Sequence, residues 1–445
     1  MKYKNILPRV CNSAAGTPYV NRRAAQKHNN HLIPRIYAAC IPHIEWSIHR
    51  LRPQGFNFID PCSFHVPPMI YADNAATTAL NPKALDAMLP FMTQYFGNPS
   101  SIHDMGLKAS QAMTNARQTI ARCLSCSPRE LTFTSGGTES DNQAILSAAA
   151  IGRKSGKCHI ITTAFEHHAV LNPLKKLESD GFDITYLDVR PDGLVRAEQV
   201  AAHIRPDTCL VTIMAANNET GTIQPVAEIG QICRQNRIIF HTDAVQAVGH
   251  IPVDIRAQNI DMLSLSAHKF GGPKGIGALF ARRDIPLTSL LEGGSQERGK
   301  RPGTENVPAI VGMAAALEAA CPRIGELQSR LIPLRNRLTD ALREIPDAIF
   351  NGDYEQRLPG HVSFCFPGCD SESMLLLLNQ KGICASAGSA CTAGSLEPSH
   401  VLLALGRTPE QAKSALRLSL SDATTPDDIN YIIQSINDIY HTIIN

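Results

Sequence analysis

The sequence predicts an α/β fold built on a largely parallel β-sheet, with a smaller α+β region after it. From residue 83, segments with helical spacing of apolar residues alternate with short strand-like runs, as in sheets covered on both faces by helices. Residues 208–215 and 238–242 are apolar and rich in β-branched side chains, which is typical of buried parallel strands. The 445 residues also exceed what one ordinary core accommodates, so two domains are expected.

The expected elements of the sheet region follow one another along the chain. Helices are predicted over 84–96, 107–123, 139–150, 169–179 and 225–235, with Pro173 in the first turn of the fourth. Strands are predicted over 131–134, 159–163, 208–215, 238–242, 262–265 and 277–280. This alternation supports a mainly parallel sheet, with seven strands in the family that the chain resembles (below).

The pattern changes near residue 320. Residues 324–342 have the spacing of a long amphipathic helix, which Pro333 is expected to kink or split. Short strands near 361–366, a helix near 371–380 and a loop of small residues over 385–395 follow. We therefore predict a large domain over 83–325 and a small α+β domain formed by 69–82 together with 326–445.

Residues 1–68 differ from the rest in composition. They hold eight prolines and nine Lys/Arg against two Asp/Glu, without lasting helical or strand periodicity. Three interpretations remain open: a non-native upstream extension, a disordered tail with a binding role, or an organellar transit peptide. The prolines and the lack of an amphipathic Arg-rich helix disfavour the transit peptide.

Whole-chain composition excludes some functions. The formal net charge of +2 gives no electrostatic case for nucleic-acid binding. The sequence contains no run of about 18 apolar residues, so no membrane span is predicted. The thirteen cysteines lack the spacing of a disulfide framework, so we expect mostly reduced thiols and a cytoplasmic location.

Polar residues gather directly after the predicted strands. Five such clusters occur, at 136–138, 166–167, 217–219, Asp243 and 266–269. In open α/β sheets, ligands bind at the carboxyl ends of the strands. The clusters therefore predict one binding site along this edge of the sheet.

Lys269 is the candidate for a covalent bond to a cofactor. It follows a strand, stands beside Ser266 and His268, and precedes a turn rich in Gly and Pro, a setting that suits a Schiff base. The alternative is a surface lysine in a turn. Lys274 is a rival, although it lies inside the turn.

Two further clusters suit an anionic, protonated ring cofactor. The run Ser135-Gly136-Gly137-Thr138-Glu139 opens a helix, whose free N–H groups and dipole favour a phosphate; a helix cap made by Ser135 or Thr138 is the alternative. Asp243 ends a buried strand, where a protonated pyridine nitrogen would compensate the carboxylate; here too an N-cap is the alternative.

Histidine and asparagine side chains extend this site. His167, the first of a His pair after a strand, is placed to stack on a planar cofactor and to move protons, although single histidines are more often structural. The run Asn217-Asn218-Glu219-Thr220-Gly221 offers amide donors, or only turn chemistry. Arg417, among alternating apolar residues, is placed to bind a carboxylate in a bidentate manner; a structural ion pair is the alternative.

Cys391 is the candidate nucleophile. It lies in a loop of small residues over 387–395, which offers few packing anchors and favours an exposed, mobile thiol; a buried inert thiol is the alternative. Cys123 and Cys126 have CxxC spacing, but no second pair completes a zinc set. We interpret these two, and likewise Cys365 and Cys369, as structural.

Together these motifs resemble a known family. Residues 69–445 are similar to group I cysteine desulfurases (the NifS/IscS type) of the class-V aminotransferase family, which bind pyridoxal 5'-phosphate (PLP). The similarity covers all but the leader and rests on a specific set of motifs: 71–78, Gly97-Asn98-Pro99-Ser100-Ser101, the Thr138 turn, His268-Lys269, 301–306, the Cys391 loop and Arg417. Residues 389–400 resemble the long group I loop rather than the shorter group II form.

The resemblance implies a role for each matching residue. Lys269 would bind PLP covalently, His167 would stack on its ring and move protons, and Asp243 would pair with the ring nitrogen. Gln246 and Asn218 would approach the ring hydroxyl or the substrate, and Arg417 would bind the substrate carboxylate. The phosphate would be held by Gly137, Thr138, Ser266 and His268, and by Thr304 from a second subunit of a homodimer.

The resemblance also implies the reaction and the partners. Cys391 would take sulfur from L-cysteine as a persulfide and release alanine, without a metal, and would act as a transient iron–sulfur ligand. A sulfur-acceptor or scaffold protein would then receive the sulfur for iron–sulfur cluster assembly or thio-modification. A selenocysteine lyase, or another PLP-dependent lyase or aminotransferase, remains an alternative. The thiol in the loop argues against a pure transaminase, and complete retention of the motifs argues against a non-catalytic scaffold.

Overall fold

The computed structural model describes residues 69–388 and 397–445, and every statement on structure below concerns these ranges. Residues 1–68, with the three interpretations given for them, and Cys391 lie outside the described residues. The elements run from β1 (Ile70–Tyr71) to α12 (Pro426–Ile444).

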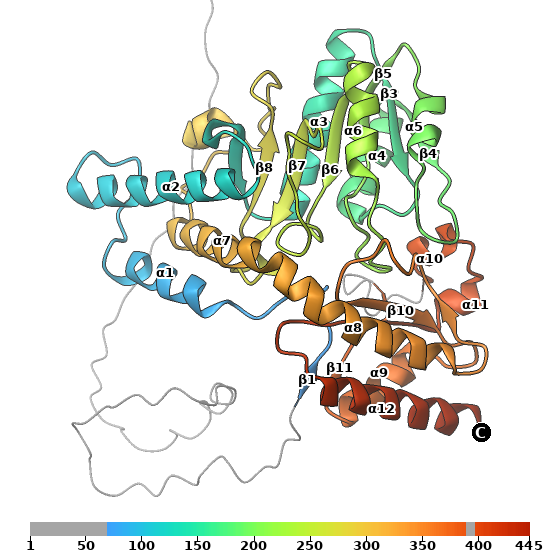
Figure 1. Cartoon of the computed structure of the whole chain (residues 1–445). Helices are drawn as coiled ribbons and strands as arrows, with labels where there is room; N and C mark the ends of the chain where they lie inside the picture. Colours follow the sequence, from blue (N-terminus) through green and yellow to red (C-terminus); the bar gives the residue numbers. More distant parts are fainter. Residues whose placement is uncertain (1–68, 389–396) are drawn as a thin grey trace, which may run out of the picture. The chain divides into compact units, whose positions relative to one another are not determined.

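A seven-stranded sheet forms the centre of the described chain, as predicted (Figure 1). The strand order is β2 (Leu131–Thr134), β8 (Gly277–Ala281), β7 (Met262–Ser266), β6 (Ile239–Asp243), β5 (Thr208–Thr212), β3 (His159–Thr163) and β4 (Asp183–Leu187). The five strands β7, β6, β5, β3 and β4 are parallel to one another. Only β8 runs antiparallel, to both β7 and β2. The sheet is thus mainly parallel, which confirms the predicted fold class.

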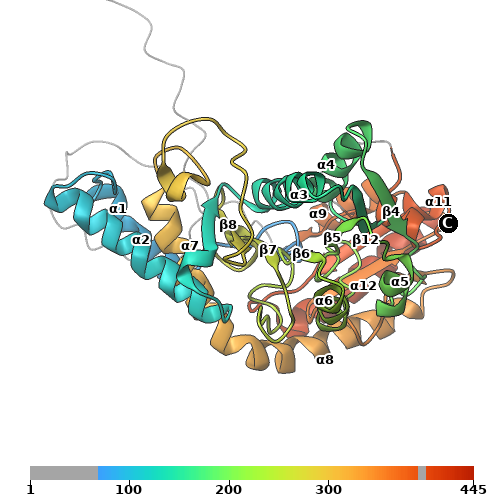
Figure 2. The same ribbon diagram turned by 90° about the horizontal axis from the view of Figure 1, so that it is seen from above.

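Helices cover both faces of this sheet. Figure 2 shows α3 (Gly137–Lys154) and α4 (His168–Ser179) on one side, and α5 (Ala197–His203) and α6 (Val226–Gln235) on the other. The inner strands β3, β5 and β7 are buried along their whole length, so their apolar side chains face helices on either side. Pro173 lies beyond the first turn of α4, so its predicted position in that turn is wrong.

A second group of helices packs beside the sheet. α1 (Pro82–Thr93) and α2 (Asp104–Cys123) pack against α7 (Val307–Ala320), which is apolar on all sides, as buried helices are. α7 passes through η5 (Cys321–Arg323) into α8 (Ile324–Arg343). Pro333 lies inside α8 without splitting it.

Within Val307–Arg343 an 18-residue window has a mean hydropathy of 1.4, so by length and composition alone this stretch is able to cross a membrane. The prediction concerned an unbroken run of about 18 apolar residues, which Glu318 and Arg323 interrupt here. Buried core helices meet the length and composition criterion as well, and Ile310, Met313 and Leu317 of α7 belong to the core around the sheet. Packing within the protein therefore accounts for the apolar character of α7.

The C-terminal part has a core of its own. An antiparallel sheet joins β12 (Ala415–Ser419), β10 (His361–Cys365) and β9 (Ile349–Phe350), and β1 pairs in parallel with β11 (Ile383–Cys384). Helices α8, α9 (Ser371–Gln380) and α12 pack on this core, and α10 (His400–Ala404) and α11 (Pro409–Ala412) precede β12. Ala72, next to β1, shares this core. The chain then runs from Ala72 to the central sheet, where Thr78 N–H donates to His268 O, so residues 73–78 lie between the two cores.

Candidate active site

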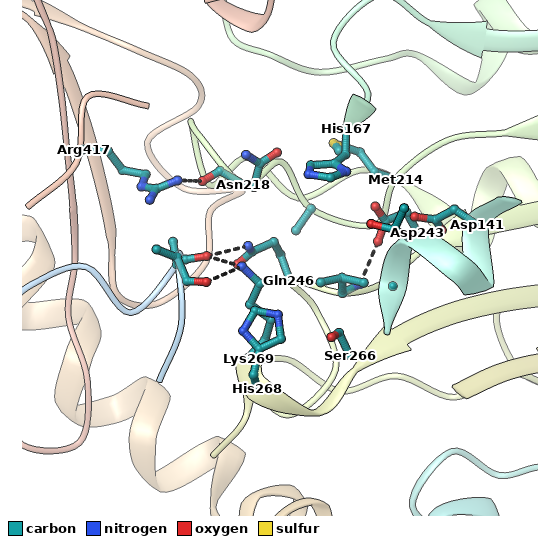
Figure 3. Close-up of a pocket in the computed structure, with 16 residues that line it drawn as sticks. Asp141, His167, Met214, Asn218, Asp243, Gln246, Ser266, His268, Lys269 and Arg417 are labelled. Carbon is teal, nitrogen blue, oxygen red and sulfur yellow. Dashed lines mark hydrogen bonds between the residues drawn. The ribbon is translucent and has the colours of Figure 1, made fainter. Parts of the chain in front are cut away.

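A pocket of about 180 Å3 lies at the carboxyl ends of the central strands (Figure 3). Its walls come from the start of α3, from the residues after β3, β5, β6 and β7, and from β12. The lining residues are Ala75, Ala76, Gly137, Thr138, Asp141, His167, Met214, Ala216, Asn218, Asp243, Val245, Gln246, Ser266, His268, Lys269 and Arg417.

Ten of the twelve predicted site residues therefore meet in one pocket. The two others are Thr304, which is exposed and does not line it, and Cys391, which lies outside the described residues. The structure brings together residues that are up to 280 positions apart, from Gly137 to Arg417. The sheet topology explains this, because parallel strands present their carboxyl ends along one edge.

The amine of Lys269 is held at the floor of the pocket. Lys269 ends the short helix η3 (Ala267–Lys269) that follows β7, and its Nζ donates to the carbonyl oxygens of Ala75, at 2.5 Å, and Ala76, at 2.9 Å (Figure 3). The rival Lys274 is exposed and does not line the pocket. The geometry thus distinguishes the two lysines in favour of Lys269.

The N-terminus of α3 opens into the same pocket. No side chain of the described residues caps it: its N-cap is Gly136, and the backbone N–H of Ser135 donates to Glu139 Oε2 at 2.7 Å. The alternative of a cap by Ser135 or Thr138 is therefore not observed. A Cβ atom on Gly137 would lie 2.7 Å from Val245 Cγ2, so close packing requires glycine there. Free N–H groups at a helix start form an anion site.

Two carboxylates, Asp141 and Asp243, line the pocket. Asp243 is only 6% exposed at the end of β6, and its Oδ1 accepts a hydrogen bond from Val245 N–H at 2.9 Å. Burial raises the pKa of Asp243 to about 6, although the Val245 N–H and the charge of Lys269 act to lower it. No helix follows Asp243, so its carboxylate caps a turn and is not the N-cap of a helix. It faces the pocket (Figure 3).

His167 is a neutral ring over the pocket. It is the N-cap of α4, where its Nδ1 accepts from Ala169 N–H at 3.1 Å, so the structural role expected of a histidine is also present. Burial, with help from the charge of Lys269, lowers the pKa of His167 to about 4. At neutral pH the ring therefore carries its single proton on Nε2.

Arg417 is fully buried and only partly satisfied. Its Nη2 donates to Asp73 Oδ1 at 2.8 Å and its Nη1 donates to Asn218 O at 2.9 Å, so the structural ion pair that was the alternative interpretation is present. Its Nε has no hydrogen-bond partner among the described residues. Since buried donors are costly when unpaired, this guanidinium has capacity for an anion in the pocket.

The neighbouring residues Asn217 and Asn218 have different roles. Asn217 is structural, because its Oδ1 accepts from the N–H groups of Glu219 and Thr220. Asn218 lines the pocket instead. Gln246 Nε2 donates to Ala75 O at 3.0 Å, the carbonyl that also holds Lys269, so Gln246 helps to position the amine's partner.

Sequence reasoning missed a buried polar layer behind Asp243. Asp141, in α3, is 1% exposed, and its Oδ1 has no hydrogen-bond partner among the described residues. His241 Nε2 lies 3.6 Å from that oxygen, and His241 also bonds to Ser264 Oγ and Thr212 Oγ1. Burial and the charge of Asp243 raise the pKa of Asp141 well above its usual value, whereas burial lowers that of His241 to about 3.

Glu166 belongs to a predicted strand-end cluster, but no role was predicted for it. Its Oε1 accepts from Thr163 Oγ and its carboxylate accepts from Met214 N–H. Burial raises its pKa to about 8. The signal for both carboxylates was their position next to predicted site residues in the sequence. Asp141 lies one helical turn after Gly137, and Glu166 directly precedes His167.

Metal binding finds no support in the part of the chain that the structure describes. No group of three or more His, Cys, Asp or Glu residues there is arranged to hold a metal ion. Cys365 and Cys369 are buried, which agrees with their structural interpretation, and Cys123 and Cys126 are partly buried.

Comparison with known proteins agrees with this arrangement. The family model described as Aminotransferase class-V matches residues 70–432. A relative named cysteine desulfurase IscS, from Methanosarcina thermophila, is 50% identical over 376 residues, which are 84% of this chain and 93% of the relative.

Solved structures show the same fold. A NifS-like protein has a TM-score of 0.79 and 38% identity, and the match covers 84% of this chain and 100% of that one. The structure described as SspA in complex with cysteine has a TM-score of 0.69 and 39% identity over 79% of this chain and 98% of its own. With a family model that spans most of its length, a close relative and this pocket, the chain belongs to the aminotransferase class-V family.

Proposed function

We propose that the protein is a PLP-dependent cysteine desulfurase, which converts L-cysteine to L-alanine and transfers the sulfur to Cys391. One observation carries the proposal: a lysine amine, a buried carboxylate and an uncapped helix N-terminus open into a single pocket. Relatives named cysteine desulfurase, and the relative solved with cysteine, support the choice of substrate.

The residues of the pocket fit PLP group by group. The free N–H groups at Gly137 and Thr138, with Ser266 and His268 beside them, suit its phosphate. The Asp243 carboxylate suits its protonated ring nitrogen, and the Lys269 amine suits its aldehyde. The neutral His167 ring suits stacking on the pyridine. When bound, PLP supplies an electron sink for the charge that develops at the substrate Cα.

The remaining steps belong to the chain's own side chains. Arg417, helped by Asn218, binds the substrate carboxylate through its unsatisfied Nε. Lys269 Nζ would take the Cα proton of the substrate, and His167 Nε2 would exchange protons beside it. The low pKa of His167 keeps a neutral ring there at pH 7.

Sulfur transfer needs a thiolate. The Cys391 thiolate attacks the substrate sulfur, a new S–S bond forms, and the Cβ–S bond breaks, so that the enzyme holds a persulfide and alanine leaves. This step rests on the sequence, because Cys391 lies outside the described residues.

A homodimer is part of the proposal. Large apolar side chains are exposed along α1 and the segment that leads into α2: Leu85, Leu89, Met92, Phe96, Ile102 and Leu107. Where such side chains form a contiguous patch, they mark a protein–protein contact. Arg301 Nε donates to Glu139 Oε1 at 2.9 Å, which anchors the segment that carries the exposed Thr304 near α3. A second copy would bring its own Thr304 to the phosphate.

The sulfur acceptor is proposed to be a scaffold or carrier protein of iron–sulfur cluster assembly or of thio-modification, in the cytoplasm. The names of the relatives support a desulfurase of the IscS type.

The test is turnover of L-cysteine by the purified protein in the presence of a thiol reductant, with alanine and sulfide measured together. Lys269→Ala should remove the visible absorbance of bound PLP and the activity, whereas Lys274→Ala, in the same turn but exposed, should retain both. Cys391→Ala should retain the absorbance and lose sulfur transfer. A reaction in which selenocysteine alone is a substrate, or in which an amino group is transferred to a keto acid, would replace this proposal by the lyase or aminotransferase alternative.

A further inference from the structure

Two cysteines line the same cavity at the far end of α2, away from the pocket. Cys123 is the last residue of α2 and Cys321 is the first of η5, between α7 and α8. Both thiols are partly exposed, and each changes the pKa of the other. The neighbouring Arg122 and Glu318 form an ion pair of 2.5 Å that joins the same two helix ends. The two thiols are therefore neighbours because the helices meet there.

Both thiols line a cavity of about 360 Å3. Its other walls are mostly apolar and include Val248, Ile251 and Ile324. The cavity gives a small molecule access to both sulfur atoms. None of the sixteen residues that line the candidate active site belongs to it.

The two thiols differ in reactivity. The hydrogen bond from Cys321 lowers the pKa of Cys123 against the effect of burial, and the charge of Arg122 lowers it further. The same hydrogen bond, with burial, raises the pKa of Cys321. A thiolate beside a protonated thiol is the arrangement in which the first attacks a disulfide and the second resolves the product.

Cys126 is the competing partner, because the sequence places it three residues after Cys123. Ser125 between them has a positive φ of 58°, so the chain turns sharply there. Cys126 does not line the cavity that Cys123 and Cys321 share. Packing therefore makes Cys321, rather than the sequence neighbour, the partner of Cys123.

We propose that Cys123 and Cys321 form a thiol–disulfide exchange site for low-molecular-weight disulfides such as glutathione disulfide. The Cys123 thiolate attacks one sulfur of the small disulfide, whose S–S bond breaks and releases one thiol. Cys321 then loses its proton and attacks the Cys123 sulfur, which releases the second thiol and leaves a Cys123–Cys321 disulfide. The protein loses two electrons and the proton of Cys321; the small disulfide gains the two electrons, and its two halves are protonated by that proton and by one from the solvent.

The Cys123–Cys321 disulfide links the C-terminal end of α2 to η5, which leads into α8. Because α2 packs on the sheet side and α8 packs on the C-terminal core, the bond fixes this junction covalently. The exchange site does not depend on the proposed desulfurase activity, so either can fail without the other.

The experiment uses the full-length protein loaded with PLP, with Cys391→Ala to remove the loop thiol. The protein is incubated with glutathione disulfide, the free thiols are alkylated, and a digest made without reductant is mapped by mass spectrometry. We expect a linked peptide pair that contains Cys123 and Cys321. Cys321→Ser should stop at a glutathione adduct on Cys123, and Cys123→Ser should leave Cys321 free to be alkylated.

Cys126→Ser is the matched control, in which the Cys123–Cys321 pair should still form. Arg122→Gln, at an exposed position, should slow formation of the adduct several-fold without affecting the fold. Retained PLP absorbance and an unchanged unfolding temperature of the reduced variants verify folding. A Cys123–Cys126 link, a lasting adduct on Cys123 while Cys321 is present, or full alkylation of both thiols would each overturn the proposal.

Discussion

At the scale of single residues, burial sets the charge of each group in the pocket. Burial raises the pKa of Asp243 to about 6, above its ordinary value, and lowers the pKa of His167 to about 4, below its ordinary value. At neutral pH this leaves an ionised carboxylate and a neutral ring. Both states suit a protonated pyridine that must stay an electron sink.

The pKa of His167 predicts a pH dependence of stability. The folded pKa is lowered below the unfolded value of 6.5, so between about pH 6.5 and pH 4 the unfolded chain binds the extra proton and acid destabilises the fold. In cofactor-free protein, His167→Asn keeps an N-cap for α4 but removes this titration. Between pH 7 and pH 5, wild type should lose about 1–2 kcal/mol more unfolding free energy than the variant in urea titrations. Equal losses would show that His167 titrates normally.

Arg417 forms an ion pair with Asp73 and is proposed to bind the substrate carboxylate. Two substitutions distinguish these contacts. Arg417→Lys cannot reproduce the planar fork, so we expect KM for L-cysteine to rise about ten- to a hundredfold, as for the loss of a charged hydrogen bond. Asp73→Asn weakens only the ion pair with Arg417 Nη2 and should change KM much less, with a loss of thermal stability instead. Steady-state kinetics of both variants decide, and equal effects on KM would assign Arg417 a purely structural role.

Sequence reasoning found the residues at strand ends and missed those behind them. Lys269, Asp243 and His167 were predictable because a parallel sheet aligns its strand ends. Asp141 was not, because a polar residue one turn into a helix is usually solvent-exposed. Its burial depends on how α3 packs over the sheet, which no local pattern encodes.

At the scale of elements, the uncapped start of α3 is the main feature of the site. Gly137→Ala places a methyl group 2.7 Å from Val245 Cγ2, so Val245 or the helix start must shift. We expect the Kd for PLP, measured by absorbance titration, to rise about tenfold, as for one lost charge-assisted hydrogen bond.

Gly325→Ala is the matched control for this substitution. Gly325 lies in the first turn of α8, with no heavy atom within 4 Å of an added Cβ. The alanine should leave PLP affinity unchanged and stabilise the helix by up to about 1 kcal/mol. PLP affinity that is the same in both variants would argue against a phosphate at the start of α3.

Most elements of the sheet were predictable, and the exceptions have local causes. The strands 131–134 and 159–163 were predicted with the bounds observed for β2 and β3. β4 and α5 were missed, because β4 is a partly exposed edge strand and α5 is only seven residues long, so neither has a strong apolar pattern. Pro333 was expected to kink or split its helix and does not split α8, since tertiary packing overrides local propensity.

At the scale of the whole molecule, the exposed apolar residues of α1 and its surroundings predict a dimer. The combined substitution of Phe96 and Ile102 by Asp, at side chains that are 73% and 94% exposed, should convert a particle of twice the chain mass to one of a single chain. Leu376→Asp, at an apolar residue of α9 that is 59% exposed, is the control and should remain dimeric. Light scattering measures the masses, and a wild-type protein of single-chain mass would contradict the dimer.

The division into a large domain over 83–325 and a small domain formed by 69–82 and 326–445 stays a prediction. The separate apolar cores around the central sheet and around β10 and β12 are consistent with it. The leader and the Cys391 loop remain known only from the sequence.

The account as a whole depends on sulfur moving from the substrate to one thiol. The most direct measurement is the intact mass, followed by peptide mapping, of PLP-loaded protein after a single turnover with one equivalent of L-cysteine and no reductant. We predict one added sulfur atom, on Cys391, together with one equivalent of alanine, and neither product with Lys269→Ala. Alanine formed without sulfur on Cys391, or sulfur on another cysteine, would contradict the account.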